Sequence, residues 1–319
     1  MPQVGVSLLV KAGEDVFVPE LPEVEALAAF LRERLIGRAV DRVDVGTINT
    51  LKTYDPQPTA LSGLTVTSVA RHGKFVDLDV DGLHLIFHLA KAGWLRWYDA
   101  APKAMIKPGK SPIALRVRFT PVLDADASTG PEGDLDAEPG FDLTEAGTKK
   151  SLAVYVVRSP SEVPGIARLG PDPLAPDFDR AALAAILAAS RQQVKGLLRD
   201  QSVLAGVGNA YSDDVLHAAK LSPFASAAKL DEAQVTRLYE ALRDVLTGAI
   251  KAATGKPAKE LKDAKRAGMR VHGRTGQACP VCGDTVREVS FADSSLQYCA
   301  TCQTGGKVLA DRRMSRLLK

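Results

Sequence analysis

Pro19-Glu20-Leu21-Pro22-Glu23-Val24-Glu25 opens the first regular element of a 319-residue chain. From Glu23 to residue 36, apolar side chains recur at helical spacing, Pro22 suits a first helical turn, and Gly37 suits the stop. The stretch therefore predicts an amphipathic helix with an acidic start.

The chemical interest of this stretch is the nitrogen of Pro19. At the start of a chain, a proline carries a secondary amine with a pKa of about 8, so more of it is unprotonated at neutral pH than of a lysine side chain at about 10.4. Such an amine attacks a sugar aldehyde to give an iminium, and a neighbouring carboxyl such as Glu20 can move protons. In the written sequence eighteen residues precede Pro19, and an amide nitrogen does not react in this way.

Alternating apolar stretches follow the predicted helix and indicate antiparallel strands. They span residues 40–45, 64–69, 75–80, 83–89, 94–98, 115–119 and 151–157. Residues 121–147 hold eight acidic and no basic side chains, and we predict a long loop there. The strands together predict a β-sandwich or barrel.

The composition changes at the proline-rich linker Leu169-Gly170-Pro171-Asp172-Pro173-Leu174. Helical spacing then predicts helices over residues 179–189, 192–201, 209–219 and 231–253. Residues 256–270 are basic and poor in large apolar side chains, which predicts a mobile linker or an arm that faces nucleic acid. Residues 250–319 carry fourteen basic against six acidic side chains, although the net charge of the whole chain is only +3.

The four cysteines form the pattern Cys279-x2-Cys282-x16-Cys299-x2-Cys302. Two such knuckles at this separation place four thiolates tetrahedrally around one Zn²⁺, and a closed site of this kind is structural. The clustering fits a metal site in a reducing cytoplasm better than a disulfide framework. We therefore predict one structural zinc ion.

A glycine-bearing turn, residues 204–211, precedes the helix that starts at Asn209. Gly206 and Gly208 allow close approach of the backbone to a ligand, and the free amides of a helix start favour a phosphate. Lys74, in a hairpin turn, is a second candidate phosphate contact. His88 follows an apolar strand, and we interpret it as a structural histidine.

The sequence contains no run of apolar residues long enough for a membrane span, and its start lacks the features of a signal peptide. We expect no membrane association, no nucleotide cofactor, a monomer, and a bacterial cytoplasmic location close to the nucleoid.

Together these stretches resemble the Fpg/Nei family of formamidopyrimidine-DNA glycosylases and endonucleases VIII. The matching segments are residues 19–25, the linker 169–174, a helix-two-turn-helix pattern over 195–211, and residues 271–274 leading into the zinc finger. The resemblance covers about residues 19–303. It implies an α+β multidomain protein: an N-terminal antiparallel β-sandwich with a flanking helix, a helical helix-two-turn-helix domain and a zinc-ribbon finger.

The resemblance further implies a base-excision repair enzyme that acts on double-stranded DNA containing oxidised bases and abasic sites. Pro19 corresponds to the nucleophile that attacks C1′, and its iminium permits β- and then δ-elimination. Glu20 corresponds to the general acid/base, and Glu23 supports the site. Lys74 and Asn209 correspond to residues that bind the phosphates flanking the lesion.

Lys91 and Arg274 are the remaining candidate DNA contacts. Lys91 stands where the family usually has a methionine that fills the gap left by the flipped base. Residues 142–150 lack the usual Arg-Phe pair, and Ser294 stands where the finger arginine is expected. These departures predict an altered lesion preference.

Val18 stands where the family has its initiator methionine, and valine codons of the GTG type can start translation in bacteria. We predict that the mature protein begins at Pro19. Two alternatives remain: an abasic-site lyase with little base excision, and a non-catalytic protein that binds damaged DNA. The predicted divisions are an extension (1–18), the catalytic sandwich (19–158), a linker (159–178), the helical domain (179–268), the finger (269–303) and a basic tail (304–319).

Overall fold

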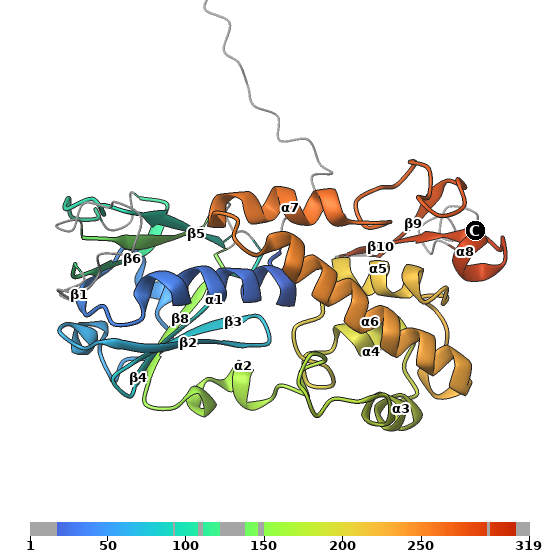
Figure 1. The fold of residues 1–319 in the computed structure, drawn as a ribbon, viewed down its shortest axis with the longest axis horizontal. Coiled ribbons are helices and arrows are strands. Elements are labelled where there is room, and N and C mark those ends of the chain that lie inside the picture. Colours follow the sequence, from blue (N-terminus) through green and yellow to red (C-terminus); the bar gives the residue numbers. More distant parts are fainter. Residues whose placement is uncertain are drawn as a thin grey trace, which may run out of the picture.

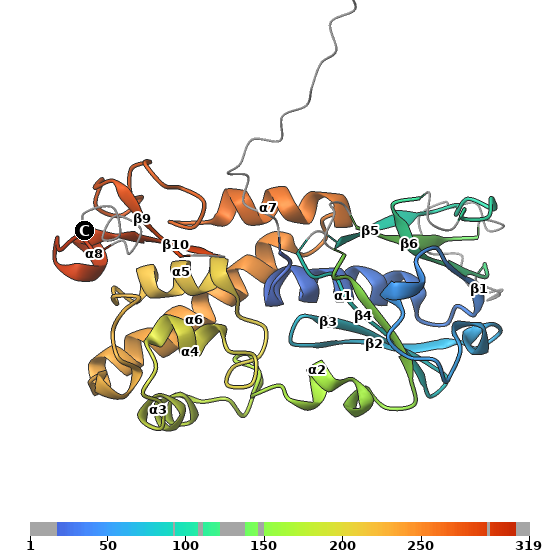
Figure 2. The same cartoon turned by 180° about the vertical axis from the view of Figure 1, so that it is seen from behind.

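The computed structural model describes residues 18–91, 93–107, 111–121, 138–145, 150–291 and 294–310. Figures 1 and 2 show an elongated molecule with a β-sandwich at one end and helices with a small finger at the other. The helices are α1 (Leu21–Leu35), α2 (Pro164–Ala167), α3 (Arg180–Ala188), α4 (Val194–Arg199), α5 (Asn209–Ala218), α6 (Glu232–Ala253), α7 (Leu261–Gly268) and α8 (Ala300–Thr304). Among these residues, no helix is long and apolar enough to cross a membrane.

The strands form two four-stranded antiparallel sheets and one hairpin. The first sheet has the order β1 (Val40–Val45), β6 (Ile113–Phe119), β7 (Gly140–Glu145), β5 (Gly93–Tyr98). The second has the order β2 (Val66–His72), β3 (Phe75–Val80), β4 (Leu83–His88), β8 (Ala153–Val157). Strands β9 (Val286–Ser290) and β10 (Ser295–Cys299) form the finger hairpin. The predicted sandwich is confirmed, and the α+β multidomain description fits the whole chain.

Strand β7 corrects the prediction of one long loop over residues 121–147. Phe141 and Leu143 are fully buried in the sandwich core, and Asp142 is buried beside them. The carboxylate of Asp142 accepts two hydrogen bonds from the guanidinium of Arg116, at 2.6 and 2.8 Å, and one from the hydroxyl of Tyr98 at 2.9 Å. Because a partner on the neighbouring strand neutralises the aspartate, an acidic sequence forms an interior strand here. Residues 122–137 and 146–149 lie outside the described part.

Helix α1 contributes to the cores of both halves of the molecule. Leu27, Leu31 and Leu35 pack in the sandwich core, whereas Leu21 packs in the core of the helical half. Leu261, from α7, packs in return against the sandwich core. The start of α1 therefore lies at the junction of the two halves.

The linker is fixed by an ion-pair bridge between the two halves. Arg71, on β2, contacts Glu25 of α1 at 2.7 Å and Asp172 of the linker at 2.6 Å. At Gly170 a Cβ atom would lie only 2.5 Å from the carbonyl carbon of Val203, so the backbone approach requires glycine.

Helix α7 corrects the prediction of a mobile linker over residues 256–270, and the alternative, an arm that faces nucleic acid, stays a prediction. The segment is poor in large apolar residues, but its Leu261 and Lys265 are both buried. Lys265 finds its partners in α1 rather than in its own helix. Figure 1 shows α7 lying above α1 and α6 between the sandwich and the finger.

Candidate active site and zinc centre

The carboxylate of Glu20 lies at the amino end of helix α5. It accepts hydrogen bonds from the backbone N–H groups of Gly208 at 2.5 Å, Ala210 at 3.0 Å and Tyr211 at 3.4 Å. Glu20 is only 2% exposed. The arrangement joins the residue after Pro19 to the helical half, because the free donors of a helix start stabilise a negative charge.

The glycines of the 204–211 turn make this contact possible. A Cβ atom on Gly208 would lie 2.4 Å from the Cδ atom of Glu20. Gly206 has a φ of +87°, and a Cβ atom there would lie 2.7 Å from the Cβ atom of Leu21. In the structure the amides of residues 208, 210 and 211 have a partner within the protein, and a phosphate contact at this helix start stays a prediction. These amides bind the carboxylate of Glu20, which is separated from them by almost 190 residues in the sequence.

Glu23 lies beside Glu20 on the first turn of α1. One of its oxygens accepts the backbone N–H of Glu20 at 2.9 Å, and the other accepts the hydroxyl of Tyr211 at 2.5 Å. Both carboxylates are thus held by donors from α1 and α5. Glu23, Tyr211 and Lys265 also line a cavity of about 830 Å³ between α6, α7 and the finger.

Lys265 of α7 is the cation of this site. Its Nζ atom lies 3.3 Å from a carboxylate oxygen of Glu20 and 3.3 Å from one of Glu23. It also donates a hydrogen bond of 2.9 Å to the carbonyl oxygen of Val18 and lies 4.9 Å from the ring centroid of Tyr211. One ammonium therefore joins the residue before Pro19 to both carboxylates.

The two carboxylates have pKa values displaced in opposite directions. Burial raises the pKa of Glu20, but Lys265, Lys74 and the amide of Ala210 outweigh it and lower the pKa to about 2. For Glu23 burial prevails over the same ammonium and the Tyr211 hydroxyl, so its pKa is raised. Glu20 is therefore a carboxylate at neutral pH and can accept a proton.

Lys74 lies in the tight turn between β2 and β3. Burial lowers its pKa, while the nearby carboxylate of Glu20 raises it and the cations of Lys265 and Arg199 lower it further. The preceding Gly73 has a φ of +57° and packs on Leu169 of the linker. The turn thus brings Lys74 into the electrostatic field of Glu20.

Pro19 is buried at this junction. Lys91 lies apart in the turn between β4 and β5 and is exposed. Within the described ranges, no hydrogen bond or ion pair joins Lys91 to Glu20, Glu23 or Lys74. The neighbouring His88 accepts the N–H of Ala90 at 3.1 Å, which agrees with a structural histidine.

The two predicted contacts near the finger are engaged within the protein. The Asn209 side-chain amide donates to the carbonyl of Ser295 at 2.8 Å. The Arg274 guanidinium donates to the carbonyl of Met269 at 3.1 Å and to the side chain of Gln277 at 3.0 Å. Neither residue lies among the contacts of Glu20.

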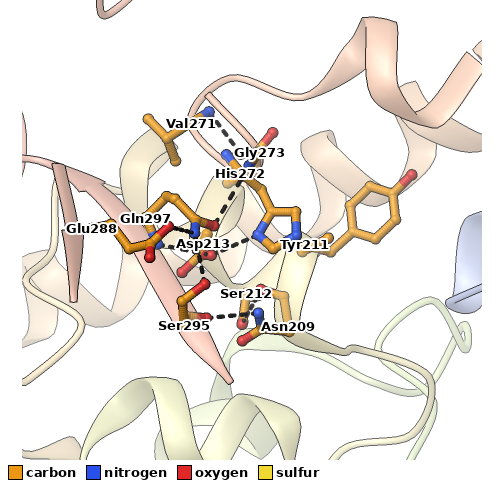
Figure 3. A network of polar contacts seen from close by, with 12 residues as sticks. Asn209, Tyr211, Ser212, Asp213, Val271, His272, Gly273, Glu288, Ser295 and Gln297 are labelled. Atoms are coloured by element: carbon orange, nitrogen blue, oxygen red, sulfur yellow. Dashed lines mark hydrogen bonds and ion pairs between the residues drawn. The ribbon is translucent and has the colours of Figure 1, made fainter. Parts of the chain in front are cut away.

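A buried polar network docks the finger on α5 (Figure 3). Asp213 accepts hydrogen bonds from the Nζ of Lys195 at 2.6 Å, the Nδ1 of His272 at 2.8 Å and the N–H of Gln297 at 3.1 Å. Its neighbour Asp214 accepts the backbone N–H groups of residues 270, 271 and 272 at 2.6 to 3.2 Å. Two adjacent aspartates therefore hold the segment that enters the finger.

The four cysteines converge at the other end of α5. Their Sγ atoms are 3.4 Å apart for Cys282 and Cys299 and 3.9 Å apart for Cys279 and Cys302. A tetrahedral zinc ion with Zn–S bonds of about 2.3 Å requires S–S separations of about 3.8 Å, so the thiolates fit the ion. The Nε2 of His217 lies 3.2 Å from the Sγ of Cys279, and His217 groups with Cys279, Cys299 and Cys302 as possible ligands.

Three family models match consecutive parts of the chain. The formamidopyrimidine-DNA glycosylase N-terminal domain matches residues 18–126, and the formamidopyrimidine-DNA glycosylase H2TH domain matches residues 169–259. A zinc finger found in Fpg and isoleucyl-tRNA synthetase matches residues 276–305. A formamidopyrimidine-DNA glycosylase of Symbiobacterium thermophilum is 31% identical over 308 residues, which cover 93% of each chain. The chain belongs to the formamidopyrimidine-DNA glycosylase family.

The chain is also similar to a mycobacterial relative and to a solved structure of the formamidopyrimidine-DNA glycosylase family. An uncharacterised formamidopyrimidine-DNA glycosylase-like protein of Mycobacterium tuberculosis is 61% identical over 151 residues, 47% of this chain and 94% of that protein. The structure of the Lactococcus lactis Fpg in complex with DNA containing an abasic site superposes with a TM-score of 0.74 at 25% identity. It covers 89% of this chain and 99% of that one.

The sequence did not reveal several residues of these sites. Lys265 lies in residues 256–270, for which the sequence predicts no helix, because α7 is short and has too few apolar residues to show helical spacing. Asp213, Asp214 and His217 are all buried in α5. The signal that could have found them is a run of polar residues inside a helix that is flanked by apolar turns. Apart from Lys195, which is 18 residues from Asp213, their partners lie more than fifty residues away in the sequence, beyond the reach of local patterns.

Proposed function

We propose that this chain is a DNA glycosylase and abasic-site lyase that reacts through the amine of Pro19. The observation that carries the proposal is the buried, ionised carboxylate of Glu20, held at the start of α5 directly beside Pro19 in the chain. A secondary amine beside a carboxylate is the pair that iminium chemistry needs. The reactive form is a chain whose first residue is Pro19.

In the proposed reaction the nitrogen of Pro19 attacks C1′ of the damaged nucleotide, and the bond between C1′ and the base breaks. Glu20 accepts the proton that the amine loses and returns it to a leaving atom. The iminium then acidifies the hydrogen on C2′, so that the 3′ phosphate leaves by β-elimination and the 5′ phosphate by δ-elimination. Glu23 keeps its place through Tyr211 and Lys265 and supports Glu20.

We infer that double-stranded DNA with a lesion lies across the junction of the two halves. Lys74, near Glu20, Asn209 at the start of α5, and Lys91 and Arg274 at the edges are the proposed contacts with the DNA backbone. The nucleotide must leave the base stack to reach Pro19. The cavity beside Glu23 is the proposed receiver of its base. Zinc bound by Cys279, Cys282, Cys299 and Cys302 would hold the finger in its folded form.

Borohydride reduction tests the proposal. With a duplex that contains an abasic site, a chain that begins at Pro19 should form a covalent adduct with DNA, and Pro19→Gly should remove most of it. The full 319-residue chain, in which Pro19 carries an acyl group, is the matched control and should form none through Pro19. Absence of an adduct from the chain that begins at Pro19 would favour a protein that only binds damaged DNA.

A second candidate is an abasic-site lyase with little base excision. The exposed Lys91 in the β4–β5 turn favours it, because an ammonium offsets unstacking less well than an apolar side chain. Duplexes with 8-oxoguanine, formamidopyrimidines or oxidised pyrimidines, compared with an abasic duplex, distinguish the two. Adducts with the abasic duplex alone identify the lyase.

We also propose that the enzyme acts as a monomer at the chromosome of a bacterial cell and needs no nucleotide cofactor. The bacterial origin of its relatives supports the location. Light scattering of the free and DNA-bound protein tests the monomer.

A further inference from the structure

The ammonium of Lys265 faces the carbonyl oxygen of Val18, the residue whose carbonyl carbon is bonded to the nitrogen of Pro19. Its Nζ donates a hydrogen bond of 2.9 Å to the carbonyl oxygen of Val18, and the carbonyl carbon of Val18 is the atom joined to the nitrogen of Pro19. The same ammonium lies 3.3 Å from Glu20 and 3.3 Å from Glu23. It is therefore directed at whatever oxygen sits on the carbon attached to that nitrogen.

In a chain that begins at Pro19, this carbon position belongs to the substrate. When the amine attacks the aldehyde of an abasic site, C1′ becomes the carbon attached to the Pro19 nitrogen, and the aldehyde oxygen takes the position of the Val18 carbonyl oxygen. The geometry is comparable because both the amide and the iminium have a planar nitrogen with a short bond to carbon. The Val18 carbonyl thus acts as a stand-in for the C1′–O group.

We propose that Lys265 is a catalytic residue that donates a proton to the oxygen on C1′ while the amine of Pro19 attacks. The inference rests on the function proposed above and assigns the acid of its first step. Lys265 is buried and fixed by α1 partners, so its ammonium is held in one direction before the substrate arrives.

The protons and charges of the step balance. The nitrogen lone pair forms the N–C1′ bond, the C1′=O π pair moves to oxygen, and Lys265 protonates that oxygen. Glu20 takes the proton from the nitrogen and passes it to the hydroxyl, which leaves as water as the iminium forms. Lys265 ends neutral, Glu20 ends ionised, and the positive charge has moved from Lys265 to the iminium.

Burial lowers the pKa of Lys265, but the carboxylates of Glu20 and Glu23 outweigh it and raise the pKa, so the ammonium gives up its proton as the positive charge of the iminium replaces its own. The groups that face Lys265 are Glu20 and Glu23 from α1 and the ring of Tyr211 from α5, and Lys74 approaches from the β2–β3 turn. Two carboxylates can stabilise one cation near them in a buried site, but an iminium beside an intact ammonium would add a like charge. Proton donation by Lys265 keeps the net charge of the site constant.

Lys265→Arg and Lys265→Met separate proton donation from charge. Arginine keeps the positive charge facing Glu20 and Glu23 but does not give up its proton in proteins. Methionine removes both properties. Lys262→Met, at an exposed position of the same helix, is the matched control for the loss of one positive charge. All variants are made in the chain that begins at Pro19.

The measurement is the single-turnover rate of borohydride-trapped adduct with an abasic duplex, together with the Kd for a duplex with tetrahydrofuran, which lacks the C1′ oxygen. We expect both Lys265 variants to slow adduct formation by about 100-fold or more, in the range typical of general acids. Their Kd for the tetrahydrofuran duplex should change far less, and Lys262→Met should leave both readouts unchanged.

A wild-type rate in Lys265→Arg would overturn the proposal and leave the lysine as a charge only. An equal loss of rate and tetrahydrofuran binding would also overturn it, because the lysine would then bind DNA. If Lys265→Met does not fold, the arginine variant decides. If the wild-type chain that begins at Pro19 forms no adduct, the proposed function itself fails, and this result is distinct from an adduct that forms equally well without Lys265.

Discussion

Two buried lysines face carboxylates: Lys195 contacts one, Asp213, and Lys265 contacts two, Glu20 and Glu23. Lys195 donates to the Asp213 carboxylate, the Ser212 hydroxyl and the Asn209 carbonyl, all within its own half of the molecule. Lys265 joins Glu20 and Glu23, and one further acceptor is the carbonyl of Val18.

The two lysines differ in whether all their hydrogen-bond acceptors belong to the folded core. The acceptors of Lys195 come from helix α5, which the core of the helical half holds in place. The Val18 carbonyl precedes Pro19, and in a chain that begins at Pro19 a substrate oxygen takes its position. A buried lysine with a complete set of structural acceptors fixes a fold, whereas one directed at a reactive nitrogen can serve chemistry.

Glu20→Gln is the strongest test of the catalytic side. The glutamine oxygen can still accept amides at the start of α5, but it cannot take a proton from Pro19. We expect base excision by the chain that begins at Pro19 to fall about 10²- to 10⁴-fold in single-turnover assays, with circular dichroism unchanged. Glu33→Gln, an exposed change on the same helix, should have no effect. Full activity in Glu20→Gln would contradict the proposal that the site of Lys265 is catalytic while the site of Lys195 is structural.

Asp213→Ala tests the structural side. It leaves the ammonium of Lys195 buried without its carboxylate and also removes the acceptor for His272. Breaking a buried pair in this way costs about 3 to 5 kcal/mol in the free energy of unfolding, which urea titration measures. Asp177→Ala, at an exposed position, serves as the control. A loss below about 1 kcal/mol would mean that Lys195 is not held by Asp213 in solution.

Zinc binding also tests the site of Lys195, because His272, which contacts Asp213, lies in the segment that enters the finger. We expect Cys282→Ser to lose the metal in the presence of a chelator, measured as zinc per chain. His217→Asn should keep one zinc ion with affinity reduced about 10- to 100-fold, as for a residue that donates to a ligand. The opposite result, with zinc retained in Cys282→Ser and lost in His217→Asn, would assign His217 as the fourth ligand.

The smallest expected effect is the pH dependence of stability from His88 on the catalytic side. Burial and the nearby Lys74 lower the pKa of His88 from 6.5 to about 4. Between these values the unfolded chain binds a proton that the folded chain does not, so stability falls as pH decreases through this window. Urea unfolding at about pH 7 and about pH 4.5 should show a smaller decrease for His88→Gln than for the wild type. Parallel decreases would show that His88 does not contribute.

Much of the fold follows local patterns in the sequence. The spacing of Leu27, Leu31 and Leu35 predicts α1, alternation predicts most strands, and Asp179 and Asp231 mark helix starts at which their side chains accept backbone amides. These signals work because each depends on neighbours within one or two turns. The cysteine pattern predicts the zinc centre for the same reason, since each knuckle is a local turn.

Two segments were predicted wrongly because their partners are distant. The acidic strand β7 is buried because Arg116 on β6 neutralises Asp142. The basic helix α7 is ordered because Leu261 reaches the sandwich core and Lys265 reaches α1. Composition alone describes both segments as solvated, since it records charge but not the opposite charge that folding brings beside it.

The order of residues alone predicts an acidic helix start at Pro19 and Glu20, two halves joined by a linker, and a cysteine finger. The placement of charge within the site came from long-range packing. The carboxylate of Glu20 accepts hydrogen bonds from the amides at the start of α5, where the sequence predicts a phosphate. Lys265, on α7, forms an ion pair with the same carboxylate. A buried charge is stable only next to partners that satisfy it, and those partners meet only when the two halves close on α1.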